Sequence, residues 1–164
     1  MKPAKLDKPD RRILSAVQNN GRMTVVELSE QVGLSQTPCL RRLRNLEAQG
    51  IIKGYTAQVD QDAVGLPVNV FVAVNLATQM HDQLEGFERS IKTFTEVMEC
   101  YLMSGGGRDY LLRVVASDIA HYERFLKEKL SKVSGIANID TSFALNTIIQ
   151  RTQLPLTSST SSNL

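Results

Sequence analysis

In the first fifty residues, apolar side chains recur at helical spacing in three short segments, each bounded by residues that start or end helices. The first segment begins at Asp7, which can cap a helix, has Pro9 in its first turn and ends at Gly21. Its apolar stripe consists of Ile13, Leu14 and Val17. This pattern predicts one amphipathic helix.

The next two segments predict a pair of short helices with a tight turn between them. Thr24 and Glu27 have the spacing of a capping box, and Gly33 suits the left-handed end of a helix. The third helix tolerates Pro38 because first-turn amides lack helical partners, and it is expected to run to Gly50. Two capped helices around a tight turn are typical of a helix-turn-helix.

After the third helix the periodicity changes to that of strands. The run "IIKGYTAQVD" predicts a small hairpin around Lys53 and Gly54, and residues 62–66 form a connection. From Pro67 onward apolar residues recur at every second position. This alternation predicts a strand with five apolar side chains on one face: Val68, Val70, Val72, Val74 and Leu76. This strand could be an ordinary core strand or could supply pairing and packing at a dimer interface.

The remaining pattern predicts a helix, two strands, a second helix and a last strand. The strands are expected at 97–103, 110–116 and 136–145. The helices carry apolar stripes made of Leu84, Phe87 and Ile91, and of Ile119, Tyr122, Phe125, Leu126 and Leu130, the second closed by Gly135. The resulting βαββαβ order is ferredoxin-like, an α+β sandwich of two helices on one sheet.

The third helix has two faces of different chemistry. At 100° per residue one arc is apolar and should face the core, with Cys39, Leu40, Leu43 and Leu46. The opposite arc is centred on Arg41. Arg can bind guanine, Asn can pair with adenine and Thr can reach a base edge or a phosphate. The predicted DNA-contacting residues are Gln36, Thr37, Pro38, Arg41, Arg42, Arg44, Asn45, Lys53 and Tyr55. Of these, Arg42, Lys53 and Tyr55 are expected to contact mainly the sugar-phosphate backbone of the DNA.

Charge supports this interpretation and composition narrows the alternatives. Residues 1–60 carry 10 Lys and Arg against 6 Asp and Glu, whereas residues 61–164 carry 9 against 11. A basic excess in the first third suits contact with an anionic polymer, although an Arg-rich helix face can also serve solubility alone. The chain has no run of 18 apolar residues and no signal-peptide core, so we expect a cytoplasmic protein without membrane contact.

Cysteine and histidine usage argues against metal chemistry. Cys39 and Cys100 lie 61 residues apart, and His81 and His121 are the two imidazoles of the chain. We therefore expect no metal site, no disulfide, no cofactor and no catalytic set. The C-terminal run "TSSTSSNL" is polar and of low complexity, so we expect a disordered tail. The predicted domains are 1–61 and 62–152, with the tail at 153–164.

A family resemblance rests on long stretches of the chain. The segment "VELSEQVGLSQTPCLRRLRNLEAQGIIKGYTA" resembles the DNA-binding part of the leucine-responsive and asparagine-operon (Lrp/AsnC) regulators, and the resemblance continues through "ECYLMSGGGRDYLLRVV" and "SFALNTIIQRTQLPL". It implies a winged helix-turn-helix, at about residues 25–44, joined to a ferredoxin-like regulatory domain. It further implies a domain that dimerises, assembles further, often to octamers, and senses an amino acid.

The stretch "SGGGRDYLL" is the candidate effector site. A phosphate loop needs a helix after its glycines, and here a strand is expected on both sides. The glycines can merely supply positive φ. Alternatively, amides of this loop can bind a carboxylate and Asp109 an ammonium, and the resemblance favours this because the family's effector pocket lies here. The predicted set is Ser104, Gly105, Gly106, Gly107, Asp109, Thr141 and Ser142. Three residues separate Gly105 from Asp109, where the family commonly has two.

Together with these patterns, the resemblance implies a DNA-binding transcriptional regulator of amino-acid metabolism or transport, modulated by an amino acid bound between subunits. The expected partners are double-stranded DNA, the effector and further copies of the chain. One alternative is an RNA-binding protein, but "RDYLLRVVA" has a single Tyr in place of the aromatic pattern of RNA recognition motifs. The other is a small metabolic enzyme with a helical accessory domain, which the lack of a catalytic pattern disfavours.

Overall fold

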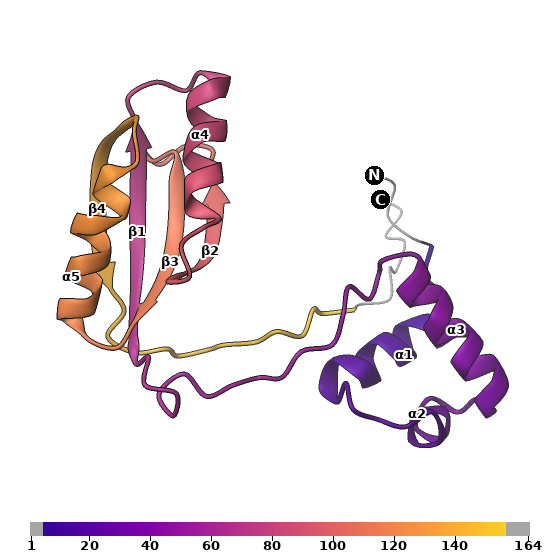
Figure 1. Cartoon of the computed structure of the whole chain (residues 1–164). Coiled ribbons are helices and arrows are strands. Elements are labelled where there is room, and N and C mark those ends of the chain that lie inside the picture. Colours follow the sequence, from indigo (N-terminus) through magenta and orange to yellow (C-terminus); the bar gives the residue numbers. More distant parts are fainter. Residues whose placement is uncertain (1–4, 157–164) are drawn as a thin grey trace, which may run out of the picture. The chain divides into compact units, whose positions relative to one another are not determined.

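The computed structural model describes residues 5–156 and divides them into two compact units (Figure 1). The first unit extends to Gln58 and also contains the segment that begins at Ile149, and the second unit is Val59–Ile148. The helices of the first unit are α1 (Lys8–Asn19), α2 (Val25–Val32) and α3 (Gln36–Ala48). The second unit contains β1 (Val68–Leu76), α4 (His81–Ile91), β2 (Val97–Leu102), β3 (Tyr110–Ala116), α5 (Ile119–Glu128), the short 3₁₀ helix η1 (Leu130–Lys132) and β4 (Ile136–Phe143).

The first two helices begin at the capping residues that the sequence predicts. The Asp7 side chain accepts from the Asp10 amide at 2.9 Å, and the Asp10 side chain accepts from the Asp7 amide. Thr24 and Glu27 form the same reciprocal pair at the start of α2. The turn to α3 passes through Gly33 at φ +69°, a conformation that favours glycine. The predicted helix-turn-helix is therefore confirmed, although α3 ends two residues before Gly50 and lacks a side-chain cap bond.

The three helices enclose one small hydrophobic core. Its buried members are Ile13, Leu14, Ala16, Leu28, Val32, Cys39 and Leu46. Cys39 has no exposed surface, which confirms it as a core residue of α3. Leu40 and Leu43 are only partly buried. This core fixes which face of α3 points inward, and hence which side chains face solvent.

The hairpin predicted around Lys53 and Gly54 is wrong, because residues 51–60 contain no strand. The amides of Ile51 and Ile52 both donate to the Leu46 carbonyl, at 3.0 and 3.2 Å, and both side chains pack on the helical core. The first apolar run therefore closes the end of α3. An isolated two-stranded hairpin is also marginal in water, so the segment gains little from pairing.

The C-terminal segment is part of the first unit, which differs from the predicted boundary at 152 and the predicted disorder from 153. The side chain of Gln18, on α1, accepts from the Leu154 amide at 2.7 Å and donates to its carbonyl at 3.3 Å. Gln58 donates to Thr152 at 2.9 Å, and Leu156 packs against the helical core. Residues 157–164 of the predicted tail lie outside the described residues.

A chain that stops at Gln150 is expected to have a less stable first unit, by about 1–3 kcal/mol, because it loses several neutral hydrogen bonds and the partial burial of Leu156. Urea unfolding followed by far-UV circular dichroism measures the change. A chain that stops at Leu156 is the matched control and should unfold like the full chain. Equal midpoints for all three chains would contradict the structural role of the segment.

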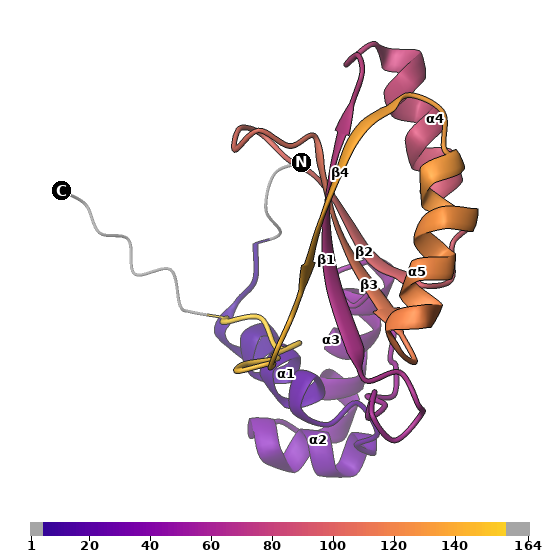
Figure 2. The ribbon, with the colours of Figure 1, turned by 90° about the vertical axis from the view of Figure 1, so that its left-hand side faces the viewer.

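The second unit confirms the predicted βαββαβ order and the ferredoxin-like α+β fold. Its strands form one sheet in the order β2-β3-β1-β4, in which each pair of neighbours is antiparallel. Both α4 and α5 pack on the same face of the sheet, and no helix of this unit covers the other face (Figure 2). The unit thus has a helical layer, a sheet and one open sheet face.

The alternation of β1 is confirmed, since Val70, Val72 and Val74 have no exposed surface. They pack with side chains of the helical layer that include Phe87, Tyr122 and Phe125. However, β1 lies between β3 and β4, so both of its edges are already paired and it cannot pair with a strand of another subunit. Two details of the α5 stripe are wrong: Ile119, the first residue after the Asp118 cap, is 67% exposed, and Leu130 is buried from η1.

Candidate DNA-binding surface and ligand loop

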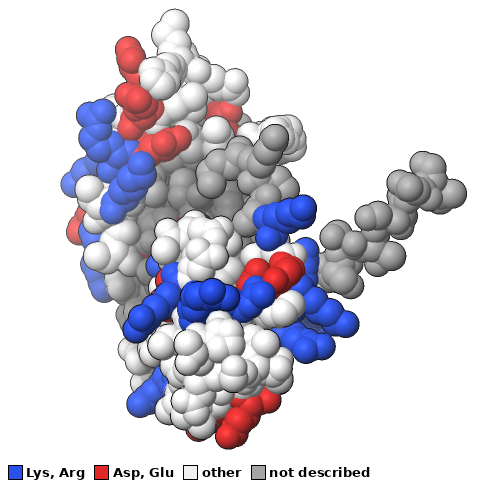
Figure 3. Space-filling view, turned by 90° about the vertical axis from the view of Figure 1, so that its right-hand side faces the viewer, with Lys and Arg blue, Asp and Glu red and all other residues white. Residues whose placement is uncertain are grey.

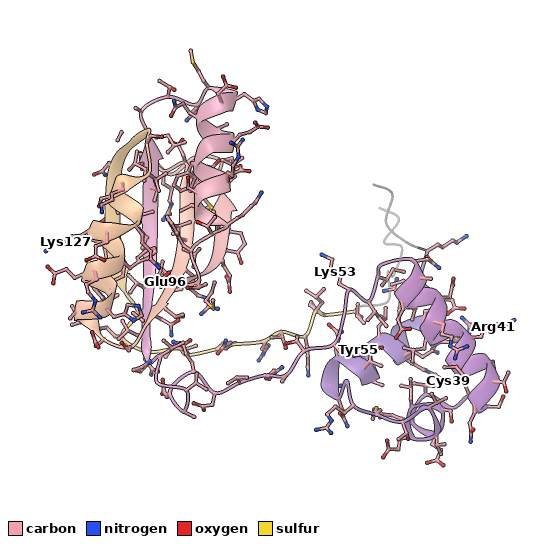
Figure 4. All side chains as sticks on the ribbon, in the orientation of Figure 1. Cys39, Arg41, Lys53, Tyr55, Glu96 and Lys127 are labelled. Atoms are coloured by element: carbon pink, nitrogen blue, oxygen red, sulfur yellow. The ribbon has the colours of Figure 1, made fainter. Side chains whose placement is uncertain are left out.

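The outward face of α3 carries most of the predicted DNA-contacting residues. Its exposed members are Gln36, Thr37, Arg41, Arg44 and Asn45, and Pro38 is partly buried. Figure 4 shows Arg41 projecting away from the other two helices, whereas Cys39 lies toward them. Since the core holds the opposite face, Thr37, Arg41, Arg44 and Asn45 share one polar and basic side of α3, and Gln36 is exposed at the first residue of the helix. We call this exposed surface the α3 face.

Positive charge gathers on the same side of the first unit. In Figure 3, which views the molecule from the side of α3, Lys and Arg side chains form a band. One small group of acidic side chains lies within this band and another lies below it. Arg41 and Arg44 have no acidic partner within 4.0 Å in the described part of the chain. Their guanidinium groups are therefore free to bind an anionic or hydrogen-bonding partner.

Arg42, predicted as a phosphate contact, makes two ion pairs within the first unit. Its Nη1 atom lies 2.7 Å from an Asp7 carboxylate oxygen and 2.8 Å from an Asp10 carboxylate oxygen. These two ion pairs join α3 to the start of α1. They also explain why the pKa of Arg42 is raised, since both carboxylates favour the charged guanidinium. Arg42 therefore stabilises the helical unit, and we leave it out of the α3 face.

The capping carboxylates predict that the first unit loses stability in acid. The Asp10 amide, with help from Arg42, holds the pKa of Asp7 below its ordinary value of 3.8, and the Thr24 amide lowers the pKa of Glu27. A carboxylate whose pKa is lowered by folding stabilises the folded state at pH values above its unfolded-state pKa. This stabilisation is lost as the pH falls through its folded-state pKa. We therefore expect the urea concentration at the midpoint of unfolding to decrease when the pH is lowered below about 4. In Asp7→Asn, which still caps but does not titrate, the fall between pH 5 and pH 3 should be smaller. An unchanged fall would contradict the assignment.

Lys53 and Tyr55 lie beyond the end of α3 and differ in availability (Figure 4). Lys53 is exposed. The Tyr55 hydroxyl donates to Glu47 at 2.9 Å, and its ring lies against Gly21, where a Cβ atom would come within 3.0 Å. Burial and the Glu47 carboxylate raise the pKa of Tyr55 to about 12. Tyr55 thus holds the segment that follows α3 against the helices of the first unit. Its hydroxyl hydrogen is already donated to Glu47 and is not available to a DNA phosphate.

The glycine loop between β2 and β3 has a conformation that requires glycine. Gly105, Gly106 and Gly107 have φ values of +83°, +77° and +69°. Three consecutive left-handed residues would strain any other side chain. The amide of Met103 donates to the Asp109 carbonyl at 2.8 Å and closes the loop. The glycines are therefore needed for the turn itself, whatever the loop binds.

Asp109 is held by the end of β1. One carboxylate oxygen accepts from the Leu76 amide at 2.8 Å, and the other accepts from Gln79 Nε2 at 2.7 Å. Asn75 donates to the Gly107 carbonyl at 2.7 Å. Asn75 and Gln79 were not among the residues that the sequence predicted for the effector site. Their polar side chains at the end of an apolar strand could have indicated them. Each Asp109 oxygen keeps a further acceptor position.

Thr141 and Ser142 do not lie at the loop within one chain. They belong to β4, which is separated from the β2–β3 loop by the width of β1 and β3. Thr141 points to the helical layer, where its hydroxyl lies 2.6 Å from that of Tyr122. Ser142 is on the opposite face, opposite Phe71. Within one subunit these two residues therefore do not reach Asp109, and their contact with an effector bound between subunits stays a prediction.

One cluster has the residue types of a hydrolase but not the geometry. Ser117 Oγ lies 3.2 Å from His121 Nδ1, and His121 Nε2 lies 3.9 Å from Glu96. The same Nδ1 atom also accepts from the Ser117 amide, the Ser117 hydroxyl donates to Asp118, and Glu96 binds Lys129 at 2.6 Å. Each group is used in capping the start of α5 or in an ion pair. The cluster therefore offers no activated nucleophile.

In residues 5–156, no group of three or more His, Cys, Asp or Glu side chains could hold a metal ion. No helix there is long and apolar enough to cross a membrane. A helix-turn-helix with a free basic face, followed by a ferredoxin-like unit with a structured glycine loop, defines a class of ligand-responsive DNA-binding proteins.

Comparisons with known proteins agree with this class along nearly the whole chain. Residues 6–53 match the winged helix-turn-helix DNA-binding model and residues 69–154 match the Lrp/AsnC ligand binding domain model. The Bkd operon transcriptional regulator of Pseudomonas aeruginosa is 42% identical over 93% of this chain and 99% of its own. The leucine-responsive regulatory protein of Escherichia coli is 39% identical over 91% of this chain and 90% of its own. The chain belongs to the Lrp/AsnC family of transcriptional regulators.

Solved structures show the same relationship. A transcriptional regulator of Neisseria meningitidis, solved as a complex with L-methionine, is 39% identical, with a TM-score of 0.88 over 93% of this chain and 97% of its own. An AsnC family regulator of Agrobacterium tumefaciens is 40% identical, also with a TM-score of 0.88, over 92% of this chain and 97% of its own. The fold, the family and its role in transcription regulation are thus shown from both sequence and structure.

Proposed function

We propose that the chain is a cytoplasmic, non-enzymatic regulator whose α3 face reads the major groove of an operator. The observation that carries this proposal is that Arg41, Arg44 and Asn45 point to solvent together with Gln36 and Thr37, while the buried core holds the opposite side of α3. Arg and Asn are the side chains that pair bidentately with guanine and adenine. Lys53, exposed beyond the end of α3, suits a phosphate contact.

Binding to duplex DNA at several salt concentrations tests this function. We expect tight binding to a duplex selected from a random library, and an affinity that falls with salt with a slope of about −0.9 per neutralised phosphate. Single-stranded RNA of the same length should compete weakly. Indifference to duplex DNA, or a preference for the RNA, would overturn the proposal in favour of the RNA-binding alternative.

We further propose that the glycine loop binds the carboxylate and ammonium of a free amino acid. The support is that Asp109 keeps free acceptor positions beside a loop of exposed glycine amides, and that a relative with the same fold was solved with L-methionine. The contacts of Asp109 with β1 couple the loop to the sheet. A thermal-shift screen against the twenty amino acids would identify the effector.

Asp109→Asn is expected to abolish the effector's influence on DNA binding while the loop keeps its shape. Asparagine retains an acceptor for the Leu76 amide but has no charge for an ammonium. Loss of a charge-assisted bond should weaken effector binding by about tenfold or more. Asp109→Ala removes the loop anchor as well, so it is the less informative change. Arg108→Ala, a neighbour in the same loop, is the matched control. An unchanged effector response in Asp109→Asn would contradict the site.

We propose that copies of the chain associate through the open face of the sheet, as dimers that assemble further, for example to octamers. Phe71 is 40% exposed and Tyr101 is 52% exposed. Both side chains belong to the open face, because Phe71 pairs with Ser142 and Tyr101 pairs with Leu111, and these positions alternate along their strands with residues that face the helices. Large aromatic side chains on an uncovered sheet are typical of an interface. Analytical ultracentrifugation of Phe71→Ser against the full chain tests this face.

A further inference from the structure

A second cleft lies on the helical side of the sheet, between α4 and the β2 edge. Its volume is about 280 Å³, and it is lined by Glu88, Ile91, Lys92, Cys100, Leu102 and Tyr110. Cys100 and Leu102 belong to this side because they stand opposite Leu112 and Tyr110, which are buried under the helices. The glycine loop curves to the opposite side of the sheet (Figure 2). We call this the α4 cleft.

The α4 cleft contains one negative and one positive group. Glu88 is on α4 and Lys92, one turn later, is the C-terminal cap of this helix, so both side chains point to the same side. Nevertheless they form no ion pair within 4.0 Å, unlike the pairs of equal spacing at His81 and Glu85 and at Glu123 and Lys127. The Tyr110 hydroxyl donates to Glu88 Oε1 at 2.9 Å, which orients the carboxylate and leaves its other oxygen unpaired in the described contacts. Two opposite charges thus line one cleft without pairing with each other.

The rest of the wall is apolar. Ile91 is 4% exposed and forms the floor with the ring of Tyr110, whereas Leu102, 62% exposed, stands at the rim. Cys100 also lines the cleft, and desolvation together with the Glu88 carboxylate raises the pKa of its thiol while Lys92 opposes the rise. A cleft of this volume is smaller than the roughly 300–1,000 Å³ that drug-sized ligands occupy. It suits a small molecule with two opposite charges and a short apolar group.

We infer that the α4 cleft binds an α-amino acid with an aliphatic side chain, as a site separate from the glycine loop. Glu88 accepts from the ammonium, Lys92 donates to the carboxylate, and the side chain lies on Ile91 and Leu102. An isolated carboxylic acid or amine satisfies one charged residue and leaves the other unpaired, so the cleft favours the zwitterion. This inference does not depend on Asp109 or on DNA binding.

Alkylation of Cys100 reports occupancy of the α4 cleft directly. Cys100 is the exposed thiol, whereas Cys39 is fully buried, so native protein treated with iodoacetamide should be modified at Cys100. The rate is measured by peptide mass spectrometry with and without L-leucine as the probe. We expect L-leucine to slow alkylation by about tenfold at saturation, and 4-methylpentanoate or 3-methylbutylamine to require concentrations about tenfold higher or more.

Variants assign the effect to the cleft. Glu88→Gln and Lys92→Gln should each raise the L-leucine concentration for half protection by about tenfold, and Glu85→Gln, one turn earlier on α4, should not. Protection should persist in Asp109→Asn. Each protein is compared with its own rate without ligand, because the charge changes also alter the thiol. No protection by L-leucine, equal protection by the two analogues, or loss of protection in Asp109→Asn would overturn the inference, whereas the DNA assay tests the proposed function separately.

Discussion

Leu46→Ala is expected to destabilise the first unit by about 2–5 kcal/mol, the usual cost of removing a buried leucine side chain. Leu46 is 2% exposed and is the last residue of α3 that reaches the core formed with α1 and α2. Because these three short helices bury only seven core residues, such a loss is large relative to the stability of a small domain. DNA binding should be lost with the fold of this unit.

Urea unfolding followed by circular dichroism, with hydrogen exchange to assign each transition to a unit, measures this effect. The second unit has its own core, so its exchange pattern should not change. Leu145→Ala is the matched control, since Leu145 is 100% exposed and its truncation leaves no cavity. A first unit as stable as that of the unaltered chain would show that α3 is held by other contacts.

Arg41→Ala is expected to weaken binding to the selected operator by about 1–3 kcal/mol and to relax the preference at one base pair. Arg41 is exposed at the centre of the α3 face, and its removal leaves the core untouched. Binding to a scrambled duplex should change less, because that binding depends on total charge. Fluorescence anisotropy with both duplexes at one salt concentration gives the ratio of the two affinities.

Arg124→Ala, on α5 of the second unit, removes the same charge from another exposed position and serves as the control. It should preserve the ratio between operator and scrambled duplex. Arg42→Ala should differ from both, since Arg42 joins α3 to α1 and its loss affects stability first. An operator preference that survives Arg41→Ala would remove this residue from the reading set.

The helix-turn-helix and the βαββαβ order could both be predicted from the sequence because their signals are local. Thr24 with Glu27, and Gly33 at a left-handed turn, specify helix ends within a few residues. The alternation of valines in β1 likewise depends only on the two-residue period of a strand. The polarity of the α3 face followed from the helical period in the same way.

The partners of individual charged and aromatic side chains could not be predicted, because they depend on how segments of the chain fold back on one another. Arg42 was expected on phosphate, but its carboxylates are supplied by the start of α1. Tyr55 was expected on the DNA backbone, but Glu47 accepts its hydroxyl. In both cases the pattern shows that the side chain is polar and near the surface, and only the packing of helices shows what it contacts.

The sequence by itself determined the family, the order of helices and strands except for the hairpin expected after α3, the inward and outward faces of α3 and β1, and the glycine-rich connection between β2 and β3. These properties depend on backbone conformation and on periodicity, which neighbouring residues specify. Only the tertiary structure decided that β1 is central, that the segment from Ile149 returns to α1, and that β1 separates the strand of Thr141 from the strand that follows Asp109. It also brought Glu88, Lys92 and Cys100 together, because strand order and helix packing place residues that no local pattern relates.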